Sequence, residues 1–582
     1  MSMQNFAVSR RALLAGSAGI ATLAGLAACG GGGNDDQSQG SAAPAGDGTP
    51  DEVQEMNLVE LNDLQTLDVN DIRNENEFEV LSELNEGLFR TFTDEDGIDH
   101  VEPAGCEDYE VTDDGLTYTF YLRDNGWSDG QPVIAQHYVD SILRLCNPDN
   151  GFSYAFLAED IAGAAAYMNG EGAAEDIAVS ALDDKTLEIR LANPIPFFLA
   201  KLSNVCFDPV RMDLIDQYAD TMSNDWEKQV YSGPFKITSR TLENSIVLEP
   251  NEHYWDKDNV KLQKLTYTIV TEDATRSQLL SSKELDSVDC TSEYVTQWAK
   301  LADQGQLVYN KKTDVGSDYL AFNHHTGGPS GLMNNVKCCL AISCCFNRED
   351  FNNTALSGLN LPAYGLIPGG ILSGDEEYRS TYEEPLLALL EQYDTPEKCQ
   401  ALFKEGVKEV TGSDDVSGVE LLILTQQQNT QSKNTTEWLA QQISAGVGVT
   451  VNINAQSETA NFVAERDSNN YDFYLMGWNA DFSDPISYFD LFATNSGYAK
   501  FMGGYSNAEY DEMYESLKTM SDSAERTAVY QKMEQNIIEN AGIAPVYYTV
   551  RHNFTQPYVM DMSFPQFGNG LEVSRAYISG KA

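Results

Sequence analysis

The order of apolar and polar residues along the chain predicts a mixture of hairpins and amphipathic helices. Apolar residues at alternate positions predict one hairpin across residues 109–123, with a turn at Asp113-Asp114-Gly115, and a second hairpin across residues 176–191. Apolar residues spaced three and four apart predict helices instead. These helices are expected at residues 77–84, 136–145, 273–282, 334–346, 395–410 and 434–444, with one or two more within 508–540.

Strands and helices alternate in the second half of the chain. Apolar runs at residues 419–425 and 449–455 flank the helix at 434–444, an order that is typical of a partly parallel sheet. Further strands are expected at residues 58–62, 262–270, 318–323, 471–476 and 543–550. A length of 582 residues exceeds one ordinary domain, so the pattern predicts an α/β protein with two or three lobes.

The first residues have the pattern of an export signal. Arg10-Arg11 precedes a short apolar run that ends in Leu26-Ala27-Ala28-Cys29, which predicts a signal peptide over residues 1–28. The paired arginines are typical of twin-arginine export, although Sec export fits the same segment. The end of the run resembles the lipobox of bacterial lipoproteins, so Cys29 is expected to carry a lipid. Residues 29–54 have little to bury and predict a flexible tether at the outer face of the cell membrane.

The charge of the chain excludes some partners. The sequence holds 36 Lys and Arg against 90 Asp and Glu, a formal net charge of −54. Nucleic-acid binding needs a basic surface, and electrostatic attraction to an anionic membrane needs one too. We therefore expect a soluble monomer that binds no nucleic acid and meets the membrane only through its N-terminal lipid.

Nine cysteines follow Cys29, so at least one must be unpaired within a monomer. Cys338, Cys339, Cys344 and Cys345 lie close together but lack the spacing of a zinc knuckle. They also lie on an expected helix, where adjacent side chains point about 100° apart. We therefore expect buried cysteines that pack as small apolar residues, no metal site and no cofactor.

The stretch from Gly477 to Pro485 places an aromatic ring, two carboxylates and two backbone bends at the end of a strand. Asp484-Pro485 is typical of a helix start, because Asp is a good N-cap and Pro fits the first helical position. Asp481 has no such structural role in the pattern, and it follows Trp478 closely. Asp481 is therefore the candidate for a ligand contact.

Several segments, in this order, resemble the extracytoplasmic solute-binding proteins of ABC importers that include oligopeptide- and dipeptide-binding proteins. The segments are residues 116–123, 127–133, 233–235, 251–255, 319–323, 356–368, 471–473, 477–485 and 509–511. Two places depart from the family. Asn479 stands where the best-known oligopeptide binders have a disulfide-forming Cys, and Cys345-Phe346-Asn347-Arg348 replaces the usual Ala-Ile-Asp-Arg.

The resemblance implies an α/β fold of two hinge-connected lobes with an extra domain inserted in the first lobe. Lobe 1 would comprise residues 55–98, 228–318 and 550–582, the inserted domain residues 99–227, and lobe 2 residues 319–549. The protein would capture a peptide between its lobes and deliver it to the permease and ATPase subunits of the importer. Such lobes open and close by hinge motion.

The resemblance also implies a set of ligand-binding residues. Asp481 would pair with the α-ammonium of the peptide, a charge-assisted bond. Gly477 and Asn479 would offer backbone groups, and Trp478 would form a wall. Glu86-Gly87-Leu88 and Tyr154 would face the ligand from the other side, and Thr549 stands where some relatives place a ligand-facing Tyr. Each polar group has a structural alternative, since Asp481 could cap a turn, Trp478 could belong to a core, and Glu86 could be an exposed charge at a helix end.

Other functions are weighed against this one. The sequence contains no G-x-S-x-G elbow, H-E-x-x-H or P-loop, so we expect no enzyme activity. The same scaffold serves binders of nickel chelates, haem, sugars and glutathione, and Asp481 favours a ligand with an amine. A surface sensor or adhesin is a third alternative, which the presence of a permease encoded nearby would disfavour.

Overall fold

The structure is a computed structural model that describes residues 48–581, except 94–96, 291–293, 428–429, 497, 500–501 and 569. The expected signal peptide, the lipidation site Cys29 and most of the expected tether lie outside the described residues. The packed chain begins before residue 54, where the tether was expected to end. The buried Gln54 side chain donates hydrogen bonds to the carbonyls of Asp51 (2.8 Å) and Ile578 (2.9 Å). No helix of the described chain combines the length and the apolar character of a membrane span.

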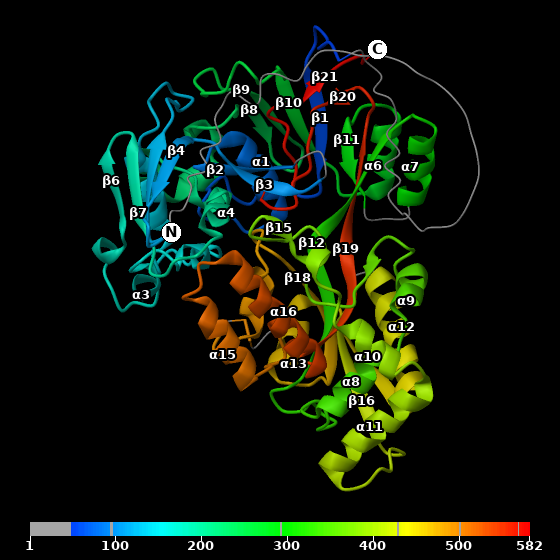
Figure 1. The fold of residues 1–582 in the computed structure, drawn as a ribbon. Helices are drawn as coiled ribbons and strands as arrows, with labels where there is room; N and C mark the ends of the chain where they lie inside the picture. Colours follow the sequence, from blue (N-terminus) through cyan, green and yellow to red (C-terminus); the bar gives the residue numbers. More distant parts are fainter. Residues whose placement is uncertain are drawn as a thin grey trace, which may run out of the picture. The chain divides into compact units, whose positions relative to one another are not determined.

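A four-stranded sheet organises the first part of the chain (Figure 1). Its strands, in spatial order, are β1 (Glu55–Glu60), β10 (Lys264–Ile269), β9 (Ser245–Pro250) and β8 (Phe235–Thr241). The pair β1–β10 is parallel and the other pairs are antiparallel. Met56 of β1, Leu84 of helix α1 (Glu75–Leu84) and Ile578 near the C-terminus share its core. Segments distant in sequence therefore build one unit around this sheet.

A second four-stranded sheet follows, with the order β4-β5-β7-β6. Its strands are β4 (Cys106–Val111), β5 (Thr117–Leu122), β7 (Thr186–Arg190) and β6 (Val179–Asp183), and helix α2 (Ala135–Leu145) packs against it. The antiparallel pairs β4–β5 and β6–β7 confirm the two predicted hairpins. Gly115 has φ of 69° in the first turn, a conformation that glycine adopts without strain. The Asp183 carboxylate accepts from the Lys185 N–H in the second (2.8 Å).

The largest sheet contains two long strands, β12 and β19, that run from beside β11 to the helix-covered part of the chain around β16 (Figure 1). Its strands, in spatial order, are β11 (Ser287–Asp289), β19 (Ile543–Thr555), β12 (Val308–Phe322), β18 (Phe473–Asn479), β16 (Glu420–Gln426) and β17 (Thr450–Gln456), and β13 (Leu361–Pro362) also pairs with β19. β12 and β19 are antiparallel, and their register shifts between Thr313 and Ser317. β16 and β17 are parallel, as their strand–helix–strand pattern predicted.

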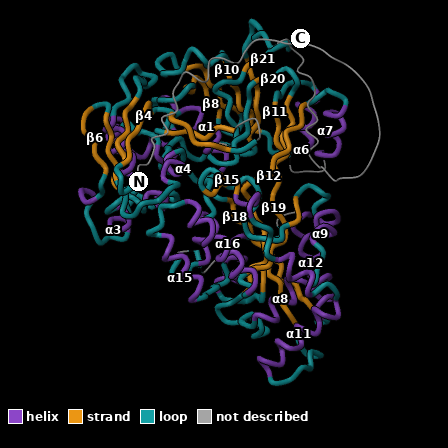
Figure 2. Tube along the Cα trace, in the orientation of Figure 1, coloured by secondary structure: helices purple, strands orange, loops and turns teal. Residues whose placement is uncertain are grey.

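Helices cover two faces of this sheet, and Figure 2 shows them gathered around β16 and β18. Leu320 of β12 packs with helices α8 (Val336–Cys344), α11 (Pro396–Thr411) and α12 (Thr430–Val447). Its neighbour Tyr319 packs on the opposite face with α14 (Ile486–Phe489) and α16 (Ser523–Glu539), beside α15 (Ala508–Leu517). This alternation follows the period of two in a strand. α11 begins as predicted, with Thr395 as its cap and Pro396 in its first position.

The remaining elements flank these sheets or lie in the segments that connect their strands. They are β2 (Phe89–Thr93), β3 (Asp99–Pro103), α3 (Ala164–Met168), α4 (Phe198–Leu202), α5 (Met212–Tyr218), α6 (Asp273–Ser281), α7 (Tyr294–Asp303), α9 (Arg348–Ala355), β14 (Leu372–Ser373), β15 (Glu376–Glu377), α10 (Leu386–Gln392), α13 (Thr459–Asp467), β20 (Val559–Met560) and β21 (Tyr577–Ile578). Together with the three sheets they form a two-lobed α/β fold. The exact limits of the lobes and of the inserted domain stay predictions.

Two strands of the largest sheet are longer than the sequence predicted. β12 starts at Val308 and β19 ends at Thr555, so both are longer than the strands expected at 318–323 and 543–550.

The nine cysteines of the described chain are free thiols. Cys338 and Cys339 lie in an apolar core with Phe403, and burial raises the pKa of the Cys338 thiol to about 12. They pack as apolar residues.

Candidate functional site

The end of β18 leaves one strand edge open. β18 pairs with β12 along its whole length, from Phe473 opposite Phe322 to Asn479 opposite Gly316. On its other edge it pairs with β16 only at Phe473 and Tyr474. Within the described chain, residues 475–479 therefore have no strand neighbour on that edge. Gly477 and Asn479 are also exposed, and an open edge of this kind can bind an extended peptide backbone.

A close approach favours glycine at position 477. It lies opposite Asp318 in the β12–β18 register. A Cβ atom on Gly477 would lie 2.9 Å from an oxygen of the Asp318 carboxylate, which is too close for a stable contact. Burial raises the pKa of Asp318 to about 7, and a hydrogen bond from Tyr547 opposes that rise. The missing side chain thus keeps the end of β18 flat against a carboxyl group that sequence reasoning did not identify.

The two aspartates after β18 have different surroundings. The buried Asp484 carboxylate accepts hydrogen bonds from the Ile486 N–H (2.9 Å) and the Tyr530 hydroxyl (2.7 Å). It therefore bonds to the first N–H of α14, but this four-residue helix begins at Ile486 with Pro485 at its cap, one residue later than the sequence predicted. The Asp481 backbone N–H donates to Ser487 Oγ (3.0 Å), but its carboxylate has no hydrogen-bond or ion-pair partner within the described chain.

Burial controls the ionisation of Asp481. The side chain is partly buried, and the loss of solvent raises the pKa of its carboxyl to about 7. Lys201 opposes this rise and Asp490 reinforces it. A carboxylate held in this way gains stability from any cation that approaches it. Asp481 is the kind of group that a ligand ammonium would satisfy.

Asp481 and Trp478 line a cavity of about 830 Å³. One wall comes from the expected inserted domain, with Phe152, Phe156, Glu159 and Lys201 among its residues. The other comes from the expected second lobe, through β18, α14, α15 and the start of α16. A volume of this size accommodates a small peptide or a drug-sized solute.

Aromatic rings join the two walls. The Trp478 indole packs edge-on against Tyr498, with ring centroids 5.1 Å apart, and donates its N–H to the Ser487 carbonyl (2.9 Å). Tyr498 in turn meets Phe156 of the opposite wall at 6.2 Å. Phe482 stacks on Phe197 at 5.2 Å. These contacts give the cavity rigid apolar surfaces of the kind that bury ligand side chains.

The cations of the cavity wall are already engaged within the protein. Lys201 forms an ion pair with Asp160, and Lys518 forms one with Glu515 (2.7 Å). Arg526 donates to the Leu517 carbonyl (2.6 Å) and to the Tyr530 hydroxyl. Of the described cavity-lining cations, none makes a hydrogen bond or ion pair with Asp481.

Glu86, Gly87 and Leu88 lie elsewhere. Leu88 is 1% exposed and belongs to the core of the expected inserted domain, and the carbonyls of Gly87 and Leu88 accept from the N–H groups of Gly105 and Cys106. Glu86 is 5% exposed and accepts a hydrogen bond from the Tyr254 hydroxyl. Burial raises its pKa to about 7. Glu86 and Gly87 line a separate cavity of about 50 Å³, so the structure does not bring them together with Asp481.

Two further residues from the sequence analysis also lie outside the large cavity. Tyr154 packs edge-on against Phe78 at 5.0 Å, although its neighbours Phe152 and Phe156 line that cavity. Thr549 lines a different cavity of about 610 Å³ beside β1, β11 and β19. Its buried hydroxyl points toward Gly316. Their assignment to the ligand stays a prediction.

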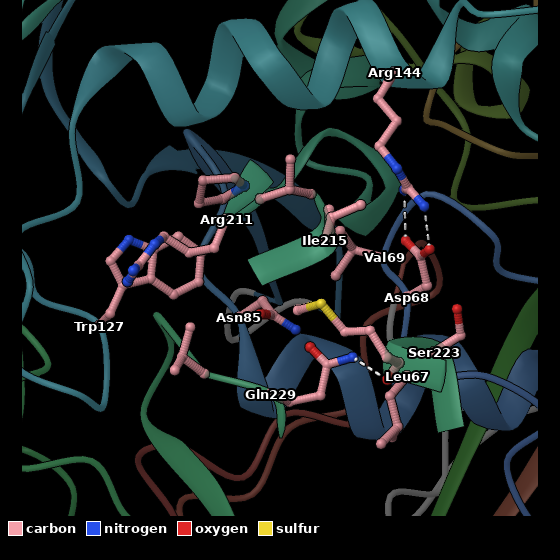
Figure 3. Close-up of a pocket in the computed structure, with 14 residues that line it drawn as sticks. Leu67, Asp68, Val69, Asn85, Trp127, Arg144, Arg211, Ile215, Ser223 and Gln229 are labelled. Atoms are coloured by element: carbon pink, nitrogen blue, oxygen red, sulfur yellow. Dashed lines mark hydrogen bonds and ion pairs between the residues drawn. The ribbon is translucent and has the colours of Figure 1, made fainter. Parts of the chain in front are cut away.

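A small cavity of about 50 Å³ near α2 is shown in Figure 3. It is bordered by the ion pair of Arg144 with Asp68 (2.5 Å) and by Gln229, which donates to the Met222 carbonyl (2.8 Å). Its charged side chains are paired within the protein, and it is too small for a peptide. Among the described residues, no group of three or more His, Cys, Asp and Glu side chains could hold a metal ion.

Sequence reasoning missed Lys201, Tyr498 and Glu159 as parts of this cavity. They stand in segments with no local motif, and Lys201 and Glu159 are about 300 residues from Asp481 in the chain. Only the fold brings them together. The single available signal was the unusual density of aromatic residues in 152–156, which helix or strand packing explains equally well.

Comparison with known proteins agrees with this architecture. The family model of bacterial extracellular solute-binding proteins, family 5 Middle, matches residues 100–500. The chain is 29% identical over 474 residues to the dipeptide-binding protein DppE of Bacillus subtilis, covering 81% of this chain and 82% of that protein. It is 27% identical over 531 residues to the periplasmic oligopeptide-binding protein OppA of Salmonella typhimurium, covering 89% and 92%.

Ligand names differ among the relatives. The probable deoxycholate-binding periplasmic protein YgiS of Escherichia coli is 26% identical over 497 residues, covering 85% of this chain and 88% of that protein. Among solved structures, the substrate-binding domain of an oligopeptide ABC transporter from Bacillus anthracis superposes with a TM-score of 0.72 at 26% identity, covering 91% of this chain and 99% of that one. The family model spans well over half of the sequence, and the chain therefore belongs to family 5 of the bacterial extracellular solute-binding proteins.

Proposed function

We propose that this protein is the substrate-binding component of an ABC importer and that it captures peptides by their free amino end. The observation that carries the proposal is the Asp481 carboxylate, partly buried in the wall of an 830 Å³ cavity and without a partner in the described chain. The α-ammonium is the positive charge that ordinary peptides share. A hydrogen bond between two such charged groups contributes about 1.5–3 kcal/mol.

The open edge of β18 supports the same ligand. An extended peptide can continue the sheet by bonding to the free backbone groups of residues 475–479. Backbone bonding of this type does not depend on side chains, which suits a protein that accepts many peptides. Trp478 and Tyr498 would then border the first side chains of the ligand.

A non-peptide solute is less consistent with the cavity. Six acidic side chains line it against three cations. The six are Glu159, Asp160, Asp481, Asp490, Asp511 and Glu515, and the cations are Lys201, Lys518 and Arg526. An anionic solute such as a bile acid would be repelled by this surface, so membership in the family does not by itself extend YgiS-like binding to this chain.

The test is calorimetric titration of tri-Ala with a free amino group against N-acetyl-tri-Ala. We expect acetylation to lower affinity at least 30-fold, because it removes the ammonium and leaves Asp481 without a counter-charge. Equal affinities would overturn the role of Asp481, and the absence of binding to any peptide would overturn the proposed ligand class. Mass spectrometry of the recovered peptide would show intact ligand if the protein acts only as a binder.

Delivery and anchoring are part of the proposal. Cys29 would carry the lipid that holds the protein at the outer face of the membrane, close to the permease. Labelling cells with a fatty-acid analogue should mark the native chain but not Cys29→Ala, and only the native chain should sediment with membranes. A Cys29→Ala protein that still sediments with membranes would contradict lipid anchoring.

A further inference from the structure

We propose that the cavity selects peptides with a second positive charge near their amino end, and that Glu159 is the residue that selects them. This proposal rests on the peptide-binding function proposed above and names the class of peptide. Glu159 directly follows the short 3-10 helix Ala155–Ala158 and lines the 830 Å³ cavity on the wall opposite Trp478.

The charges of the cavity do not cancel internally. Asp160 is paired with Lys201, and Glu515 with Lys518. The Asp490 carboxylate accepts from the Tyr514 hydroxyl (2.7 Å), and the Asp511 carboxylate accepts from the Thr494 N–H (2.9 Å). Four of the six lining carboxylates thus have partners in the protein.

Asp481 and Glu159 are the two that remain. Neither carboxylate accepts a hydrogen bond or forms an ion pair within the described chain. The third cation of the wall, Arg526, is held by backbone carbonyls and by the Tyr530 hydroxyl, which also bonds to Asp484. A ligand with only an α-ammonium would satisfy Asp481 and leave Glu159 facing it without a counter-charge.

The two carboxylates face a common space. Burial and, after it, the charges of Asp481, Asp490 and Glu159 together raise the pKa of the Tyr498 phenol to about 12. Tyr498 touches Trp478 on the wall of Asp481 and Phe156 on the wall of Glu159. One aromatic ring therefore spans the interval between the two charges. The aliphatic stem of a Lys or Arg side chain can pack along such a ring while its charged end reaches Glu159.

The test compares four peptides by calorimetry at 0.15 M salt: Lys-Ala-Ala, Ala-Lys-Ala, and the same two with norleucine in place of Lys. Norleucine keeps the stem and removes the charge. In the native protein we expect Lys to be preferred about fivefold to tenfold at one of the two positions, since the Glu159 side chain keeps solvent contact that partly screens the pair, although burial raises its pKa to about 7.

Variants locate the preference. Glu159→Gln should reduce the ratio of Lys to norleucine affinity to below twofold and leave the affinity for the norleucine peptides within twofold of the native value. Glu515→Gln is the matched control, because it removes the same charge from the lining of the same cavity, on the opposite wall, at a carboxylate already paired with Lys518. It should keep the preference.

Three outcomes would overturn the inference. They are equal affinity for Lys and norleucine peptides in the native protein, a preference that persists in Glu159→Gln, and a preference lost equally in Glu515→Gln. In all three, peptides still bind, so the proposed function stands and only the selectivity fails. If none of the four peptides binds the native protein, the proposed function fails, and the selectivity fails with it.

Discussion

Residues 477–481 and residues 86–88 are both glycine-containing segments beside an acidic side chain, but they differ in how a ligand can reach their polar groups. At 477–481 one strand edge is open, and the Asp481 carboxylate lines the large cavity without a partner in the described chain. At 86–88 the backbone carbonyls bond to residues 105 and 106, and one Glu86 oxygen accepts from Tyr254 while the other, Oε1, is buried without a partner in the described chain. Glu86 and Gly87 lie outside the large cavity, so ligand recognition should concentrate at 477–481.

The largest expected effect separates the two acidic residues. Asp481→Asn should lower the affinity for a free-amine tripeptide about 30- to 300-fold, because the ammonium would be desolvated without a counter-charge. Glu86→Gln should change it less than threefold, because its carboxyl bonds to Tyr254 and lies outside the large cavity. Calorimetric titration of the tripeptide into each variant measures both affinities. Similar losses in both would place Glu86 beside the ligand, as the family resemblance implies.

A smaller effect should follow from pH. The pKa of Asp481 in the free protein is raised to about 7, whereas an ammonium bound to it would lower that pKa. Below pH 7 a proton must leave Asp481 before the ligand binds, so affinity should fall about 10- to 30-fold from pH 7.5 to 5.5. The α-ammonium, with a pKa of about 7.7–8.0, stays mostly protonated over this range. The dependence of affinity on pH should disappear in Asp481→Asn. An equal pH dependence in that variant would mean that another group titrates.

A third effect tests the open strand edge. N-methylation of one ligand amide removes a single hydrogen-bond donor, worth about 0.5–1.5 kcal/mol, so affinity should fall about two- to tenfold for the amide that meets residues 477–479. Methylating each amide of Ala-Ala-Ala-Ala in turn and measuring each affinity would locate that contact. Uniform affinities along the series would mean that the ligand does not extend the sheet.

The smallest effect concerns stability without ligand. A raised pKa means that the folded chain binds the Asp481 proton more tightly than the unfolded chain, so this carboxylate destabilises the fold increasingly as the pH rises from about 4 through 7. Asp481→Asn should therefore unfold at higher urea at pH 8, with a gain of about 1–2 kcal/mol that vanishes near pH 4.

Asp484→Asn is the matched control for this measurement. Its carboxylate is buried and already accepts from Ile486 and Tyr530, so its loss should destabilise the protein by about 1–3 kcal/mol. A destabilised Asp481→Asn at pH 8 would show that Asp481 has a structural partner.

The hairpins, the capped helix at Thr395 and the parallel pair β16–β17 could be predicted because each depends on a local pattern of apolar spacing or capping residues. The first half of β12 could not, because Asn310, Lys311 and Lys312 have the composition of a loop. Those residues form a strand because β19 lies beside them and satisfies their backbone.

The residues of the candidate site also fall into those that a local pattern identifies and those that only the fold brings together. Asp481 could be found because a strand end and a helix start flank it and leave it without a local role. Glu159 and Lys201 could not, since their position depends on how two distant parts of the chain meet. The resemblance transferred Glu86 by residue type, but it could not show that Tyr254 bonds to that carboxyl.

The shifted register between β12 and β19 has a mechanical consequence. Thr313 lies opposite Val550 and Ser317 opposite Tyr548, so three residues of one strand stand against Thr549 alone. An interrupted ladder leaves residues unpaired, bends the strand and increases its local twist. We expect these strands to bend more easily at this point than at the regular pairs on either side. Substitutions in the walls of the cavity could then alter ligand selectivity without changing the stiffness of β12 and β19 at this irregular pairing.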